Sequence, residues 1–427
     1  MRFVALYFVI IFSFCQFGFS QNDLNYYISA AKVNSPLIQD NKNQSAAAKI
    51  EAERIKAVYT KPQVTFMGSL SFSPIISQDS GKTKLVFSPS DAIKYVGYDI
   101  AASNGGVYMG LINVNQPLFN NSKYKTAAEQ ALIGARINEN NIQISGHDIE
   151  KIVGDQYILC FQDMKQIDYL NNLIELIKEQ KTSVTKLAED GLLKQSDMLL
   201  VNIEYQTQLN MLNYYNAVYK RDLMDLNILC GINDTSYVAI KDINLAVNPN
   251  ITFSKFTEKF RLDSLNLVAS QKIFELKYKS QLSAFGNAGL NGVYVPTLPN
   301  RFGMSAGLNF TVYIFDGKQK SLNQKKTDIL IKSTQAYKSN FVTQNTIRKS
   351  KLLTEISSLE ARMAIASAQL KDYKQLLEFY KKELMTGQQS VVLYITTVKG
   401  LATLQRDYVL MQTNKQLLIN TYNYWNW

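Results

Sequence analysis

The sequence predicts a mainly α-helical chain with a β portion, in which one strand–strand–helix–helix unit occurs twice. Each half contains a long helical stretch without proline, and each such stretch follows two short segments that alternate between apolar and polar residues. The same separation, 196 residues, lies between Phe119 and Phe315 and between Gly191 and Gly387. Identity between the halves is low, so the layout is repeated more than the sequence.

Residues 1–20 are typical of an export signal. Arg2 supplies a positive charge, an almost unbroken apolar stretch follows, and Ser20 provides a small residue before the expected cut. An uncleaved anchor fits less well, because the apolar stretch is too short to span a bilayer. Lipidation of Cys15 is disfavoured because the bulky Phe14 precedes it. No long apolar run follows, so any further membrane contact must use strands.

Repeat 1 is expected to cover residues 21–231. A helix begins near residue 21 and is interrupted at Pro36, since proline disrupts a helix interior. Strict alternation from Val64 to Phe72 predicts a strand. Residues 73–103 lack a period and contain prolines and glycines, which indicates a loop. The predicted elements are strands 62–73 and 107–116, a long helix 123–188, and a helix 196–229 that ends at Gly231.

Repeat 2 is expected over residues 259–427, after an irregular connector at 232–258 that contains Pro249. Its predicted elements are a helix 259–280, strands 282–292 and 303–313, a long helix 319–385 and a helix 390–427. Apolar residues from Leu352 to Leu384 recur every three or four positions. This spacing averages about 3.5 residues, the period of helices packed lengthwise as in coiled coils.

The strand and helix lengths restrict how the chain can assemble. Strands of about ten residues suit a tilted crossing of the hydrocarbon layer, yet the smallest single-chain barrels need about eight strands. Open edges are not tolerated in lipid. Several chains must therefore share one β-barrel to which each contributes four transmembrane strands. Two chains or three would both satisfy this. The long antiparallel helical hairpins need equally long partners and would form an α-barrel.

Several short motifs at the element boundaries resemble the TolC family of outer-membrane efflux proteins. Residues 115–119 and 313–317 are similar to that family's two strand–helix junctions, which here contain Pro117, Phe119, Phe315 and Gly317. Residues 191–199 and 387–395 are similar to its two turns between long helices. The resemblance implies a homotrimer with twelve strands and a periplasmic α-barrel. It also implies outer-membrane lipid, a periplasmic adaptor and an inner-membrane transporter as partners.

The resemblance also assigns roles to the turns. It implies that the adaptor contacts the periplasmic tips, at Gly191, Leu192, Gly387 and Gln388. Asp197 matches an acidic position that lines the pore in that family, although it equally suits the first turn of a helix, where the helix dipole favours an acid. At the second turn Leu393 and Thr396 stand where the family carries acids. The acidic constriction is therefore expected to be reduced.

These observations favour an outer-membrane exit duct of a tripartite export system, conducting small molecules or drugs. The outlet of a type I protein secretion system stays an alternative, because the inner-membrane partner selects the cargo. A structural periplasmic coiled-coil protein would explain the helices but leave the strands without a role. Basic residues are dispersed among acids and amides despite a formal net charge of +11, which indicates solvated helix faces and no binding of nucleic acid.

No catalytic, cofactor-binding or metal-binding site is expected. His147 is the only histidine and is predicted to be an exposed helix residue. Cysteine–histidine clusters and phosphate-binding glycine loops are absent from the sequence. Cys160 and Cys230 are expected to be buried and unpaired. If the chain turns at Gly191, Cys160 is level with Asp222, and Cys230 lies roughly 12 Å farther on, beyond disulfide reach.

Overall fold

The computed structural model describes residues 22–87, 93–98, 106–386 and 388–427. The expected export signal, Cys15 and Gly387 lie outside these residues. The chain divides into two compact units. Unit 1 contains residues up to 39, 142–256 and 341–427, and unit 2 contains residues 40–141 and 257–340. Among the described residues, no helix combines the length and the apolar character needed to cross a membrane.

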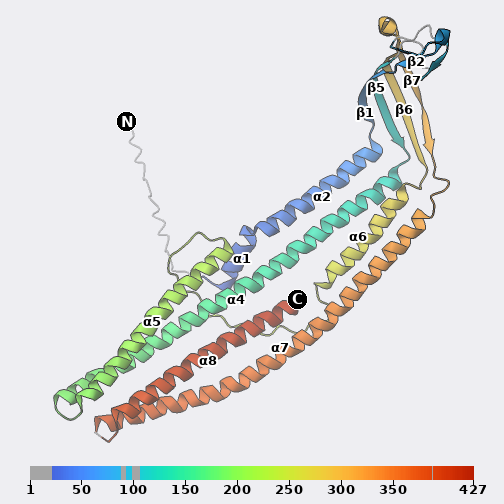
Figure 1. The fold of residues 1–427 in the computed structure, drawn as a ribbon. Helices are drawn as coiled ribbons and strands as arrows, with labels where there is room; N and C mark the ends of the chain where they lie inside the picture. The colour runs from blue at the N-terminus through green and yellow to red at the C-terminus, as the bar shows by residue number, and fades with distance from the viewer. Residues whose placement is uncertain (1–21, 88–92, 99–105, 387) are drawn as a thin grey trace, which may run out of the picture. The chain divides into compact units, whose positions relative to one another are not determined.

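Unit 2 contains a four-stranded antiparallel sheet (Figure 1). Its strands are β1 (Gln63–Phe72), β5 (Gly106–Leu118), β6 (Gln281–Gly292) and β7 (Phe302–Thr311), in that order across the sheet. A short 3-10 helix, Val295–Asn300, connects β6 to β7. In β6, Gly289 has a φ of 154°, and a Cβ atom there would lie 2.1 Å from the Gly110 carbonyl oxygen. Only glycine allows β5 and β6 to approach this closely.

The prediction of a loop over residues 73–103 is wrong in part, because this segment contains a second small sheet. Strands β2 (Ile75–Ser77), β3 (Lys84–Val86) and β4 (Tyr95–Val96) pair in the order β3-β2-β4, and a 3-10 helix, Asp79–Gly81, follows β2. The Asp79 carboxylate accepts hydrogen bonds from the backbone N–H groups of Ile93 and Lys94, at 3.1 and 2.7 Å. Strands of two or three residues are too short to show a period in the sequence.

The helices of unit 2 flank the strands in the chain. Residues 40–60 of α2 (Pro36–Thr60) belong to this unit and precede β1, and α6 (Thr257–Leu276) precedes β6. The helix expected over 259–280 therefore begins two residues earlier and stops at Leu276. The N–H groups of Tyr278 and Lys279 bond to the carbonyls of Glu275 and Leu276 in tighter turns before β6 begins. The first turns of the two longest helices, α4 and α7, complete this unit.

Unit 1 is helical. It contains α1 (Leu24–Asn34), α5 (Gln195–Cys230), α8 (Val391–Trp425) and the greater part of α4 (Asn121–Glu189) and α7 (Gln319–Met385). The 69 residues of α4 correspond to about 100 Å of helix. The stripe predicted along the second long helix is buried at Leu352, Ile356, Leu359, Ala366, Leu370, Leu377 and Leu384. The C-terminal half of this stripe packs with residues of α4, α5 and α8 in one apolar cluster.

A second apolar cluster of unit 1 joins α1, α4 and α5 and contains both described cysteines. Cys160 and Cys230 are buried and free. Burial raises the pKa of the Cys230 thiol to about 11, so the thiol stays neutral and unreactive. Gly231, at a φ of 63°, ends α5 as expected. The side chain of Asn34 donates to the carbonyls of Cys230 and Gly231, at 2.9 and 3.1 Å, which ties α1 to the end of α5.

Candidate functional site

The four-stranded sheet has two faces of different chemistry. The register pairs Phe66 with Ile112, Ile112 with Ala288, and Ala288 with Met304, so these side chains share one face. The other residues of that face, at alternating positions of each strand, are apolar except for Gln116. The opposite face carries mainly amides and hydroxyls, at Gln63, Thr65, Ser69, Ser71, Asn113, Asn115, Gln281, Ser283, Asn287, Asn291, Ser305, Asn309 and Thr311.

The apolar face is exposed in the single chain. Leu70 and Met304 are 77% and 80% exposed, and Phe66, Leu308 and Phe310 are exposed as well. Not one aspartate, glutamate, lysine or arginine occurs within these four strands. A water-soluble sheet of this length would carry charges on its solvent face and on its edges. The apolar face therefore requires a covering, and lipid or another protein surface can supply it.

Both edges of this sheet are open within the part of the chain that the structure describes. There, β1 and β7 pair with a neighbour on one side only, so each presents a row of unpaired backbone groups. The four strands alternate in direction, because each pairing is antiparallel. The β1 strand of one copy can consequently lie antiparallel to the β7 strand of another, and the ladder can continue through several copies.

Two strand–helix junctions connect β5 to α4 and β7 to α7. Pro117 is in β5, and Phe119 follows with a φ of 56° before α4 begins at Asn121. In repeat 2 Phe315 precedes Gly317, whose φ is 63°, and α7 begins at Gln319. The Asp316 carboxylate accepts from the N–H groups of Lys318 and Lys320, at 2.9 and 2.8 Å. Phe119 and Phe315 are 90% and 83% exposed, so both junctions present an aromatic ring outward.

The first tip turn is formed by Gly191 and Leu192. Gly191 has a φ of 75°, and the N–H groups of Leu192 and Leu193 bond to the Leu187 carbonyl, at 2.8 and 3.1 Å. This bonding ends α4, while Leu193 packs against the apolar cluster that the four long helices share. Leu192 is 71% exposed at the end of the hairpin.

The second tip turn is built differently. The Gln388 N–H bonds to the Glu383 carbonyl at 2.9 Å, and the Gln388 side chain is exposed. The Ser390 hydroxyl caps α8 by accepting from the Leu393 N–H at 3.4 Å. Gly387 is outside the described residues. Leu192 in the first turn and Gln388 in the second are thus both exposed at the end of a hairpin.

Asp197 is placed at the third position of α5. Its carboxylate accepts a hydrogen bond from the Lys194 N–H at 3.3 Å, which is the bonding expected of an acid in the first turn of a helix. The structural role proposed for Asp197 is thus present in the fold. A role in lining a pore stays a prediction, because it depends on copies of the chain beyond this one.

Polar contacts connect the two hairpins within unit 1. Glu204 of α5 is 2% exposed and lies 3.4 Å from Lys399 of α8, while Gln208 donates to the same carboxylate at 2.8 Å. Lys381 of α7 lies 3.0 Å from Glu179 of α4. Sequence reasoning missed these links, because the partners lie about two hundred positions apart and carry no local pattern.

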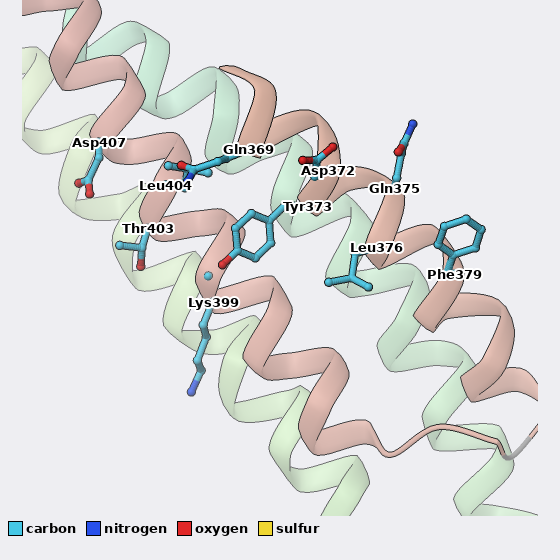
Figure 2. Close-up of a pocket in the computed structure, with 11 residues that line it drawn as sticks. Gln369, Asp372, Tyr373, Gln375, Leu376, Phe379, Lys399, Thr403, Leu404 and Asp407 are labelled. Carbon is cyan, nitrogen blue, oxygen red and sulfur yellow. The ribbon is translucent and has the colours of Figure 1, made fainter. Parts of the chain in front are cut away.

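A groove of about 910 Å³ runs along α7 and α8 (Figure 2). Tyr373 points across the groove to α8, whereas Gln375 and Phe379 point away from α8 (Figure 2). A Cβ atom on Gly400 would lie 2.9 Å from the Tyr373 ring, so the glycine lets the ring rest on the helix backbone. Asp372, Lys399 and Asp407 give the groove charges of both signs.

His147 contradicts the prediction of an exposed helix residue. Its side chain is only 11% exposed and stacks on Tyr424 and Trp427, with ring centroids 4.9 and 4.4 Å apart. Its ring nitrogens bond to the Glu150 carboxylate at 3.0 Å and to the Tyr424 carbonyl at 2.9 Å. The C-terminal aromatic residues cover the histidine, and this could not be read from its position within α4.

The described residues contain no group of three or more histidine, cysteine, aspartate or glutamate side chains that could hold a metal ion. The half-buried Glu150 instead pairs with two basic side chains. Lys32 and His147 both bond to Glu150, and the His147 hydrogen bond contributes most to lowering the pKa of that carboxyl to about 2.

The fold matches solved outer-membrane channels along nearly the whole chain. The Campylobacter jejuni CmeC outer membrane channel aligns at 14% identity and a TM-score of 0.67, over 96% of this chain and 86% of that one. The outer membrane protein VceC of Vibrio cholerae aligns at 12% identity and 0.70, over 94% and 96%. The open-state MtrE channel of Neisseria gonorrhoeae aligns at 11% and 0.65, over 94% and 88%.

The chain has the fold of these outer-membrane channels. The mainly α architecture with a β portion, which the sequence predicted, is confirmed. No family model and no curated protein matches the chain by sequence. The channel fold is therefore retained at identities of 11–14%. Helix periodicity, strand alternation and turn residues can specify the same fold without many identical residues.

Proposed function

We propose that this chain is the outer-membrane exit duct of a tripartite export system. It would conduct substrates passively from a periplasmic adaptor and an inner-membrane pump to the exterior. The observation that carries this proposal is the uncharged four-stranded sheet, with one apolar face, one polar face and two open edges. Lipid covers such an apolar face, and water fills the polar side.

Copies of the chain close the sheet. Four strands per chain are too few for a barrel, and unpaired edges are costly in lipid. Antiparallel pairing of β1 with β7 of the next copy removes both edges at once. We propose a homotrimer with twelve strands, a number that rests on the resemblance to the TolC family.

The cargo is proposed to be small molecules, on the same resemblance to efflux proteins. The polar face supports conduction without selection by charge, because its amides and hydroxyls carry no formal charge and cannot repel ions of either sign. No feature of the described residues favours protein secretion over efflux. A structural coiled-coil role is disfavoured by the apolar sheet face.

The periplasmic tips are proposed to dock the adaptor. Leu192 and Gln388 support this, because each is exposed at the end of a hairpin whose flanking residues pack inward. Gly191 shapes the first turn, and Gly387 is assigned here from the sequence alone. In the proposed assembly Asp197 would line the pore near the entrance.

The test begins with cell fractionation of the full chain. The proposal expects the protein in the outer membrane after a high-salt wash, and deletion of its gene should sensitise cells to a panel of toxic compounds. Recovery in the salt wash would overturn the membrane assignment. Unchanged sensitivity together with loss of a secreted protein would favour the type I secretion outlet.

A further inference from the structure

Lysines follow or precede every strand of the sheet at the end nearest the helices. In an antiparallel sheet these ends meet at one edge, as the pairs Gln63–Asn115, Leu118–Leu282 and Gln281–Thr311 show. The strands themselves contain no charge. Seven lysines two to nine residues along the chain from these strand ends are called the lysine belt: Lys61, Lys123, Lys125, Lys277, Lys279, Lys318 and Lys320.

The positive charge of the lysine belt is only partly neutralised. Lys320 lies 3.8 Å from Glu275, and Lys277 bonds to Gln319 and lies 4.1 Å above the Phe274 ring. In the part of the chain that the structure describes, Lys61, Lys125, Lys279 and Lys318 have no carboxylate within 4.0 Å. Four exposed ammonium groups therefore remain for an anionic partner.

Two of the lysines are close enough to repel each other. Lys123 is buried and donates to the Ser280 carbonyl at 2.7 Å. Burial and then the positive charge of Lys279 lower the pKa of Lys123. An anion bound beside Lys279 would relieve this repulsion.

Large apolar side chains lie beside the lysine belt. Phe119, Ile314 and Phe315 are 90%, 96% and 83% exposed. Tyr278, Tyr313, Phe315, Lys318 and Lys320 help to line one groove of about 650 Å³ at the second junction, which Glu275 and Asp316 line as well. Large apolar side chains next to the exposed Lys318 ammonium group match the boundary between acyl chains and headgroups of a bilayer.

We propose that the lysine belt binds anionic phospholipid headgroups of the periplasmic leaflet, while Phe119, Ile314 and Phe315 enter the adjoining acyl region. This inference rests on the proposed function, which places the helix-side end of the sheet at that leaflet. Charge complementarity selects the occupant, because basic residues at a membrane surface attract anionic lipids. The exposed rings fix the depth at which the headgroups meet the lysines.

The test uses the full chain in neutral detergent, mixed with increasing phosphatidylglycerol or phosphatidylcholine. Thermal unfolding of the wild type should shift upward with phosphatidylglycerol and far less with phosphatidylcholine. The triple variant Lys61→Gln, Lys125→Gln, Lys318→Gln should require more phosphatidylglycerol for half of the shift. The increase should be about fivefold for each lysine, which corresponds to about 1 kcal/mol each. Added salt should reduce the preference.

The matched control removes the same charge elsewhere in unit 2. Lys42→Gln, Lys332→Gln, Lys338→Gln changes three exposed lysines that lie roughly 20 Å or more along α2 or α7 from the strands. This control should keep the wild-type preference. Equal shifts with both lipids, an equal loss in the control, or the same shift with inorganic phosphate would each overturn the proposal. Outer-membrane fractionation of the triple variant shows separately whether the duct assignment survives.

Discussion

At the scale of single residues, the most informative feature is a pair of buried carboxyls in unit 1. Asp163 of α4 is 2% exposed, and its Oδ2 atom has no hydrogen-bond partner among the described residues. Asp222 of α5 is also buried and pairs with Arg221 at 2.8 Å. Burial first, and then the charge of Asp222, raise the pKa of Asp163 to about 7. Asp163 therefore favours its neutral form in the fold.

This raised pKa predicts a loss of stability as pH rises. The folded chain holds a proton on Asp163 that the unfolded chain releases near 3.8, so this group's contribution is complete below that pH and is lost as pH rises through about 7. Asp163→Asn removes the buried charge and should raise the free energy of unfolding by on the order of 2 kcal/mol at about pH 8.

Thermal unfolding at about pH 5 and about pH 8 checks this expectation, because the gain should be larger at the higher pH. Asp225→Asn, on the exposed face of α5, is the control and should show no such gain. A lower midpoint for Asp163→Asn at the higher pH would contradict the interpretation that burial and the charge of Asp222 raise the pKa of Asp163.

The buried acid Glu204 makes a second residue-scale prediction. Lys399→Met removes its cation and leaves Gln208 as the remaining partner, so the free energy of unfolding should fall by about 2 kcal/mol. Lys399 is 62% exposed, which keeps this below the cost of breaking a fully buried pair. Adding Glu204→Gln should restore much of the loss. Additive effects in the double-mutant cycle would show that the pair is not coupled.

At the scale of elements, the two helical hairpins achieve the same reversal with different turns. Gly191 accepts a left-handed conformation and no atom lies within 4 Å of where its Cβ would be, so the first turn depends on backbone freedom alone. The second described turn depends on the Ser390 cap. Because both ends are solvent-exposed, changes there should leave the packing of the hairpins intact.

The proposed docking at the tip predicts a loss of export without a loss of stability. Leu192→Glu should change the free energy of unfolding by at most about 0.5 kcal/mol, since the side chain is exposed. It should weaken adaptor binding at least about tenfold, because burying a leucine contributes about 1.5–3 kcal/mol. Resistance to toxic compounds and pull-down of the adaptor measure the effect.

Ile228→Glu is the matched control for this variant. Ile228 is 74% exposed and lies on α5 as well, roughly 50 Å along the helix from the tip. It should retain wild-type resistance. If Leu192→Glu binds the adaptor as the wild type does, the tip does not dock it through this side chain.

At the scale of the whole molecule, closure between copies is the central expectation. Ser69 of β1 and Ser305, Asn309 or Thr311 of β7 lie on the polar face of the two edge strands. Cysteine at Ser69 combined with cysteine at one of these β7 positions should link neighbouring copies, because paired strands bring Cα atoms to about 5.5 Å. Non-reducing electrophoresis should show a three-copy species for at least one pair.

Cys160 and Cys230 do not complicate this experiment, because both are buried, and Cys15 lies in the expected export signal. Cysteines at Ser69 and Asn287 form the control, since Asn287 is in the inner strand β6 and has no open edge. A limit at two copies would favour an eight-stranded closure. Absence of links in all three pairs would contradict β1–β7 pairing.

Much of the fold could be predicted from local periodicity in the sequence. Alternation from Val64 to Phe72 indicated β1, and the recurrence from Leu352 to Leu384 indicated the buried stripe of α7, because each period reflects one face of one element. The left-handed turns at Gly191 and Gly231 were readable from glycine itself. The junction roles of Phe119 and Phe315 came from the family resemblance, and their separation of 196 residues supported only the repeat.

Only the tertiary structure decided which distant residues meet. His147 is covered by Trp427, Asp163 meets Asp222, and Glu204 meets Lys399. The lysine belt shows the same limit, since its lysines are dispersed along the chain and gather because four antiparallel strands end at one edge. Periodicity reports the face of an element that is buried, whereas pairwise contacts and local charge depend on how several elements pack together.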